Sequence, residues 1–84
     1  MNTDWTGDID DDCTLRRYGM LAHVECLDRG WWWFAIYRGE WPNETELCNT
    51  SDFENPVRLT TGKMARAAAE CMMEVLRSMT GAAG

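Results

Sequence analysis

The sequence predicts an α+β fold, in which a three-stranded antiparallel sheet carries one C-terminal amphipathic helix packed on one face. Three observations lead to this prediction. Residues 18–27 alternate between apolar and mixed positions, and residues 31–38 are almost entirely aromatic or β-branched. Residues 63–79 are rich in Ala, Met, Glu, Arg and Leu, with apolar residues three and four apart. A short third strand is expected between residues 31–38 and the helix, which gives the order β-β-β-α.

The first predicted strand shows the period-two pattern of a strand that is covered on one side. Its alternate faces are Tyr18, Met20, Ala22, Val24 and Cys26, all apolar, and Gly19, Leu21, His23, Glu25 and Leu27, which are mixed. The sequence Asp28-Arg29-Gly30 follows, and its glycine favours a tight turn. A hairpin should therefore join this strand to the next one.

The second predicted strand, residues 31–38, is apolar on both faces, so we expect it at the centre of the sheet. Its two faces are Trp31, Trp33, Ala35 and Tyr37, and Trp32, Phe34, Ile36 and Arg38. One set packs under the helix. The other set is exposed, covered by the N-terminal arm, or buried in an oligomer. A polar third strand at residues 44–50, with Leu47 as its main apolar contact, should form an edge.

The helix is predicted over residues 61–79, with Thr60 or Thr61 as its N-cap and Gly81 as its stop signal. Its expected core-facing stripe is Met64, Ala68, Cys71, Met72, Val75, Leu76 and Met79. Charged residues, including the i,i+4 pair Arg66 and Glu70, lie off this stripe.

Length and charge restrict the classes of partner. The 84 residues are expected to form one domain over residues 14–84, preceded by a flexible acidic arm at residues 1–13. The net charge is −6, and ten of the fourteen acids lie in residues 1–12 and 40–54, which contain no base. This balance disfavours free nucleic acid and anionic membranes, and it favours a protein partner with a basic surface. The polar N-terminus does not read as a signal peptide, so we expect a cytoplasmic protein.

Residue spacing does not favour catalysis or a cofactor. The four cysteines form no Cys-x-x-Cys pair and His23 is the only histidine, so zinc has no usual framework. Residues 8–12 resemble a calcium loop, but Cys13 stands where the turn glycine belongs. His23 shares a strand face with Glu25 but has no nucleophile on that face. We therefore expect a non-enzymatic protein without cofactors, in which Cys26 and Cys71 are core residues and Cys13 is exposed.

The segment from Gly30 to Gly39, the polar hairpin after it and the helical residues 61–76 resemble the strand–turn–strand–helix layout of small accessory proteins of phages and mobile elements, including anti-CRISPR proteins. The resemblance lies in size, acidity and layout. It implies a stoichiometric inhibitor that docks on a host defence complex, such as a CRISPR-Cas effector subunit, and blocks DNA binding or nuclease recruitment.

Acidic and aromatic side chains are the candidate contacts for such a partner, because acids match a basic surface and Trp dominates interface hot spots. The predicted binding residues are Asp10, Asp11, Asp12, Trp32, Glu40, Trp41, Glu44 and Glu46. The alternative is a structural or regulatory subunit that self-associates, for example as a homodimer, through an exposed aromatic sheet face.

Overall fold

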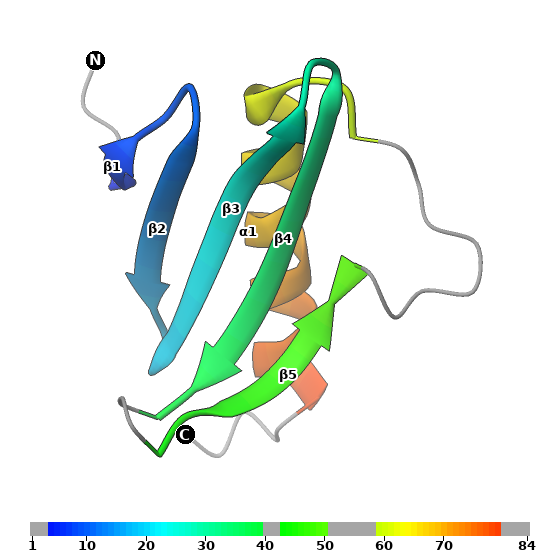
Figure 1. The fold of residues 1–84 in the computed structure, drawn as a ribbon. Helices are drawn as coiled ribbons and strands as arrows, with labels where there is room; N and C mark the ends of the chain where they lie inside the picture. The colour runs from blue at the N-terminus through cyan, green and yellow to red at the C-terminus, as the bar shows by residue number, and fades with distance from the viewer. Residues whose placement is uncertain (1–3, 40–42, 51–58, 80–84) are drawn as a thin grey trace.

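The computed structural model describes residues 4–39, 43–50 and 59–79. Five strands precede one helix: β1 (Thr6–Asp8), β2 (Asp12–Arg17), β3 (Met20–Asp28), β4 (Trp31–Arg38), β5 (Thr45–Asn49) and α1 (Gly62–Met79). The strands form one antiparallel sheet in the order β1-β2-β3-β4-β5 (Figure 1). The predicted α+β class and the C-terminal helix are confirmed. The predicted number of strands is wrong, because the sheet has five.

β1 and the first two residues of β2 lie in residues 1–13, where the sequence predicted a flexible arm, and the rest of β2 lies in residues 14–17, where no strand was predicted. The acidic run forms the turn between β1 and β2: Asp8 Oδ1 accepts a hydrogen bond from the Asp10 backbone N–H, and the Asp8 carbonyl accepts one from the Asp11 N–H. Asp and Asn favour such turns because their side chains bond to the nearby backbone. With β1 and β2 added, β3 becomes the central strand, and β4 lies between β3 and β5.

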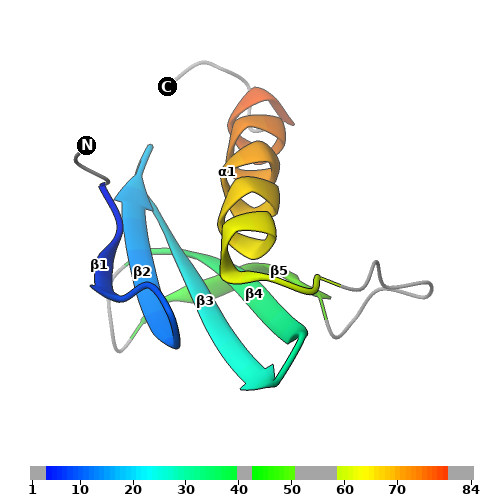
Figure 2. The ribbon, with the colours of Figure 1, turned by 90° about the horizontal axis from the view of Figure 1, so that it is seen from above.

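Helix α1 covers one face of the sheet and lies over β3 and β4 (Figures 1 and 2). We call this the covered face. Cross-strand partners on it are apolar in consecutive rows: Cys13, Val24 and Phe34 form one row, and Leu15, Ala22 and Ile36 form the next. All six residues are buried. The apolar alternation predicted for residues 18–27 therefore faces the helix from Met20 onward, whereas Tyr18 precedes β3 and is exposed.

The stripe that faces the sheet is rotated from the one predicted, although the predicted Ala68, Met72 and Leu76 pack against the core at its margin. Ala65, Ala69 and Met73 are fully buried, whereas Met64 and Val75 are exposed. The prediction gave weight to large side chains. Alanine at 65 and 69 instead lets the helix approach the sheet closely, and Met73 fills the space beyond them.

Trp32 lies on the covered face and packs against the core. A Cβ atom on Gly62 would stand 2.8 Å from the Trp32 ring and 3.1 Å from the Ile9 carbonyl oxygen, so a larger residue there would have to displace its neighbours. The Trp32 backbone N–H also donates to the Leu59 carbonyl at 2.8 Å. Thr61 caps α1, because its hydroxyl accepts from the Met64 N–H at 3.1 Å.

The cysteine assignments are reversed at two positions. Cys13, expected to be exposed, is only 1% exposed on β2, and burial raises the pKa of its thiol. Cys71, expected in the core, is exposed on α1. The reason is the same in both cases: β2 is part of the sheet, and the helix is rotated relative to the predicted stripe. Cys26 is half-buried, and all four thiols are free.

Candidate functional site: the open face of the sheet

The sheet face opposite α1 has no helix or strand over it among the described residues (Figure 2). We call it the open face. Its side chains form three cross-strand rows: Asp8, Asp12, Glu25 and Trp33; then Thr6, Thr14, His23, Ala35 and Asn49; then Arg16, Leu21, Tyr37 and Glu46. Trp33 and Tyr37 therefore lie on β4 in the first and third rows, and most of the charges on this face are acidic.

Trp33 is held in place by its neighbours on the open face. Its indole N–H donates to Asn49 Oδ1 at 2.8 Å, and the Asn49 amide donates in turn to Glu46. His23 meets the Trp33 ring edge to face, with 5.6 Å between the ring centroids. Ala35 is fully buried between these residues, although it does not belong to the core beneath α1. These contacts fix the orientation of the indole on the open face.

The first row places three carboxylates side by side on neighbouring strands. Asp8 pairs with Asp12 and Asp12 pairs with Glu25. Asp12 Oδ1 accepts a hydrogen bond from Nε2 of His23, so this carboxylate has a donor. Glu25 is half-buried and has no hydrogen bond or ion pair within the described part of the chain. Like charges in directly opposite positions destabilise a sheet, so the row is electrostatically unfavourable in the free protein.

The third row lies on the other side of the middle row from Trp33. Tyr37 stands between Leu21 and Glu46 in the register. Burial raises the pKa of the Tyr37 hydroxyl, and the nearby charges of Glu46 and Glu44 raise it further. The phenol therefore stays neutral near pH 7 and can donate a hydrogen bond. Arg16 is the one cation among the residues of the three rows.

The structure separates the predicted binding residues. Asp12 and Glu46 lie on the open face, at opposite ends of it. Asp10 and Asp11 are exposed in the turn before β2, and Glu44 is exposed just before β5, so these two groups occupy opposite corners of the sheet (Figure 1). The remaining predicted residues fall elsewhere: Trp32 on the covered face, and Glu40 and Trp41 outside the described residues.

Sequence reasoning missed Trp33 and Glu25 as parts of one site. The signal was present in two strand patterns. The mixed face of the first strand contains His23 and Glu25, and a hairpin with its turn at residues 28–30 brings that face against Trp33 and Ala35. The sequence left open which aromatic set of residues 31–38 the helix covers. The pairing answers this, because the mixed face of residues 18–27 lies beside Trp33 and Ala35, and that face is turned away from the helix.

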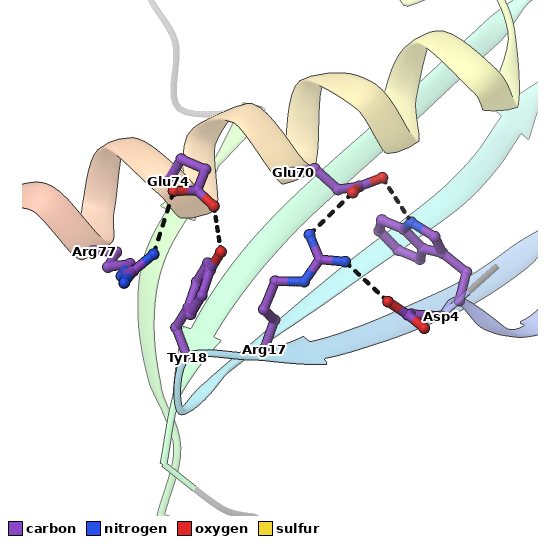
Figure 3. Close-up of polar contacts among 7 residues, drawn as sticks. Asp4, Arg17, Tyr18, Glu70, Glu74 and Arg77 are labelled. Atoms are coloured by element: carbon purple, nitrogen blue, oxygen red, sulfur yellow. Dashed lines mark hydrogen bonds and ion pairs between the residues drawn. The ribbon is translucent and has the colours of Figure 1, made fainter.

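A second polar cluster connects α1 to the N-terminal strands (Figure 3). Arg17 donates to Glu70 at 3.1 Å and to Asp4 at 3.2 Å, and the Trp5 indole N–H also donates to Glu70. The Glu70 bond is the main reason that the pKa of Arg17 is raised. The two contacts of Glu70 join the helix to β2 and to the segment before β1, and the contact between Arg17 and Asp4 joins β2 to that segment. The cluster fixes the helix on the sheet.

Tyr18 belongs to the same connection and has an unusual backbone. It occupies the turn between β2 and β3 with φ of 57°, followed by Gly19 at 73°. Its hydroxyl donates to Glu74, and the Arg77 guanidinium lies 4.4 Å from the centre of its ring. A bulky residue at positive φ costs about 1 kcal/mol or more, so these contacts offset backbone strain.

We expect Tyr18→Phe to lower the free energy of unfolding by about 1 kcal/mol, because it removes the hydroxyl bond and keeps the strain. Tyr18→Asn should be closer to the parent, since asparagine tolerates positive φ and relieves the strain as it removes the ring contacts. Urea unfolding measures both. An asparagine variant less stable than the phenylalanine variant would show that the ring contacts outweigh the strain.

Other types of site receive no support from the described residues. Across residues 4–39, 43–50 and 59–79, no three His, Cys, Asp or Glu side chains converge as metal ligands. In the same part of the chain, no helix has the length and apolar character needed to cross a membrane. No protein-family model, no curated protein and no solved structure is significantly similar to this chain.

Proposed function

We propose that this chain is a non-enzymatic protein-binding domain whose open face docks on a basic surface of another protein. One observation supports the proposal: on a face that no described helix or strand covers, Trp33 is held by Asn49 and stands directly opposite Glu25, a half-buried carboxylate with no hydrogen bond or ion pair among the described residues. An apolar anchor beside an unpaired acid fits a cationic side chain that has an apolar stem, which both Arg and Lys provide.

The two components of the open face have different roles in binding. Trp33 is already held by Asn49 and His23, so little side-chain entropy is lost when a partner packs on it. We assign most of the lasting affinity to this residue. The carboxylates of Asp8, Asp12 and Glu25 attract a basic surface and orient it as it approaches. Self-association through the open face is less favourable, because it would bring two predominantly acidic surfaces together.

For the identity of the partner, we propose a nucleic-acid-handling complex, in line with the resemblance to small acidic phage proteins. A protein that binds DNA or RNA carries clustered Lys and Arg to hold phosphates. The carboxylates of the open face would occupy those cations and keep nucleic acid, or a recruited nuclease, away from them. In this proposal the chain acts as a stoichiometric inhibitor of a host defence complex.

The test begins with proteins that co-purify with the parent chain from a bacterial lysate and are identified by mass spectrometry. Binding of the purified partner is then measured at low and high salt, for the parent and for Glu25→Gln. The variant should bind more weakly at low salt, with a slower association rate, because one attracting charge is lost. The same variant should be more stable than the parent by about 0.5 kcal/mol, because it relieves repulsion from Asp12.

The matched control is Asp28→Asn, which removes the same charge from the exposed last residue of β3, outside the carboxylate row. It should change the association rate less than Glu25→Gln and should not raise stability. Equal effects of the two variants on binding would mean that only net charge matters, and the open face would lose its assignment as the site.

A further inference from the structure

His23 connects the acidic and the aromatic parts of the open face. Its Nε2 atom lies 2.5 Å from Asp12 Oδ1, and its ring meets the Trp33 indole edge to face, with 5.6 Å between the ring centroids. It is the one histidine of the chain, and its side chain is 29% exposed, so protons reach the ring from the solvent. One ring that can gain a charge therefore contacts both the carboxylate row and the apolar anchor.

The ionisable side chains around His23 on the open face are mostly acidic. In the three rows they are Asp8, Asp12, Arg16, Glu25, Tyr37 and Glu46. Burial and the nearby acids raise the pKa of Tyr37, so this phenol is neutral near pH 7. Arg16 lies in the third row, on the other side of the middle row from the carboxylates of the first. Helix α1 lies on the covered face, so its charged residues do not face the ring (Figure 2).

We infer that protonation of His23 weakens the binding of a basic partner to the open face, so that the partner is released in mildly acidic solution. The inference rests on the proposed function, because it concerns the regulation of the same face. Histidine is the side chain whose charge ordinarily changes between about pH 5 and 8. The neutral ring donates to Asp12 and leaves the negative charge of that carboxylate to attract the partner. The protonated ring forms an ion pair with Asp12 and neutralises it.

The proton should change the electrostatic attraction more than the apolar contact. The Trp33 indole is also held by Asn49, which carries no charge, so the anchor keeps its orientation when His23 is protonated. The expected effect is therefore a slower association rate with little change in the dissociation rate, and it should decrease at high salt. Its size should be similar to that of Glu25→Gln, because each change removes one unit of negative charge from the same part of the face.

The test uses the full chain and a fluorescent peptide of about nine arginines, since guanidinium groups keep their charge at all the pH values used. Binding kinetics are measured at low salt at about pH 8 and about pH 5.5, a range in which most Asp and Glu carboxylates stay ionised. The parent should bind at least about threefold more weakly at the lower pH. The matched control is His23→Gln, whose amide can still donate to Asp12 but gains no proton, while every other ionisable group is kept. Whatever its affinity at the higher pH, this variant should bind about equally at both pH values.

A second measurement observes the proton itself and needs no variant. The chain has one histidine, so its ring signals in an NMR spectrum of the parent belong to His23, and they should change over the pH range in which binding weakens. A parent that binds the peptide no better than Glu25→Gln at the higher pH would overturn the proposed docking face and this inference with it. If Glu25→Gln does weaken binding, but the parent binds equally at both pH values or a folded His23→Gln keeps the pH dependence, the inference alone is overturned.

Discussion

Met73→Asp is expected to remove most of the stability of the domain. The Met73 side chain is fully buried between α1 and the covered face. Aspartate there would bury an unpaired charge, and it would also leave the volume of the methionine side chain unfilled. We expect a loss of about 4 kcal/mol or more, against a total of about 4–13 kcal/mol for a domain of this length. Urea unfolding followed by circular dichroism measures the change.

The matched control for this prediction is Ala67→Asp, which introduces the same residue on the exposed side of the same helix. It should cost about 0.5 kcal/mol, the difference in helix propensity between alanine and aspartate. Met72→Asp should fall between the two, because Met72 is half-buried at the margin of the core. If Met73→Asp were no worse than Ala67→Asp, the helix would present a different side to the sheet.

Trp33→Ala is expected to weaken binding of the partner at least about 30-fold, mainly through a faster dissociation rate. Truncation of a central interface Trp commonly costs about 2 kcal/mol or more, and each 1.4 kcal/mol is a factor of ten in affinity. The effect should change little with salt, because the lost contact is apolar. Binding kinetics with the identified partner at two ionic strengths measure both properties.

Trp33→Phe separates the apolar contact with the partner from the hydrogen bond that holds the Trp33 indole in place. Phenylalanine keeps a flat apolar side chain but cannot donate to Asn49. It should therefore bind better than alanine and worse than the parent. Circular dichroism must show that the variants are folded, because Trp33 also covers Ala35. A folded Trp33→Ala protein that binds as tightly as the parent would remove the open face as the site and leave the acidic turns as the candidates.

The elements with a clear local signal could be predicted from the sequence. Alternation identified β3, aromatic and β-branched residues identified β4, and helix formers with a threonine cap identified α1. The polar edge strand β5 was also expected. These signals are strong because side-chain period and backbone propensity depend only on neighbours along the chain. They determined the α+β class and the position of the hairpin between β3 and β4.

The N-terminal strands and the binding face depended on contacts that are distant in sequence. β2 has a short alternating pattern that becomes recognisable as part of the sheet only when Cys13 and Leu15 pair with Val24 and Ala22. The row of carboxylates exists because three strands are in register, and no local pattern places Asp12 opposite Glu25. The choice of Trp33 over Trp32 as the uncovered indole likewise required knowing which face the helix covers.

Helix α1 also shows the difference between what local sequence signals determine and what tertiary contacts decide. The sequence by itself determined that residues 62–79 form a helix with a broad apolar arc. That arc is wider than the sheet can cover, so periodicity alone could not select the side that faces the core. The tertiary structure selected Ala65, Ala69 and Met73, because close packing favours small residues where a helix crosses a sheet. Met64, Cys71 and Val75 were left uncovered, since one narrow helix cannot bury its whole apolar arc against one sheet.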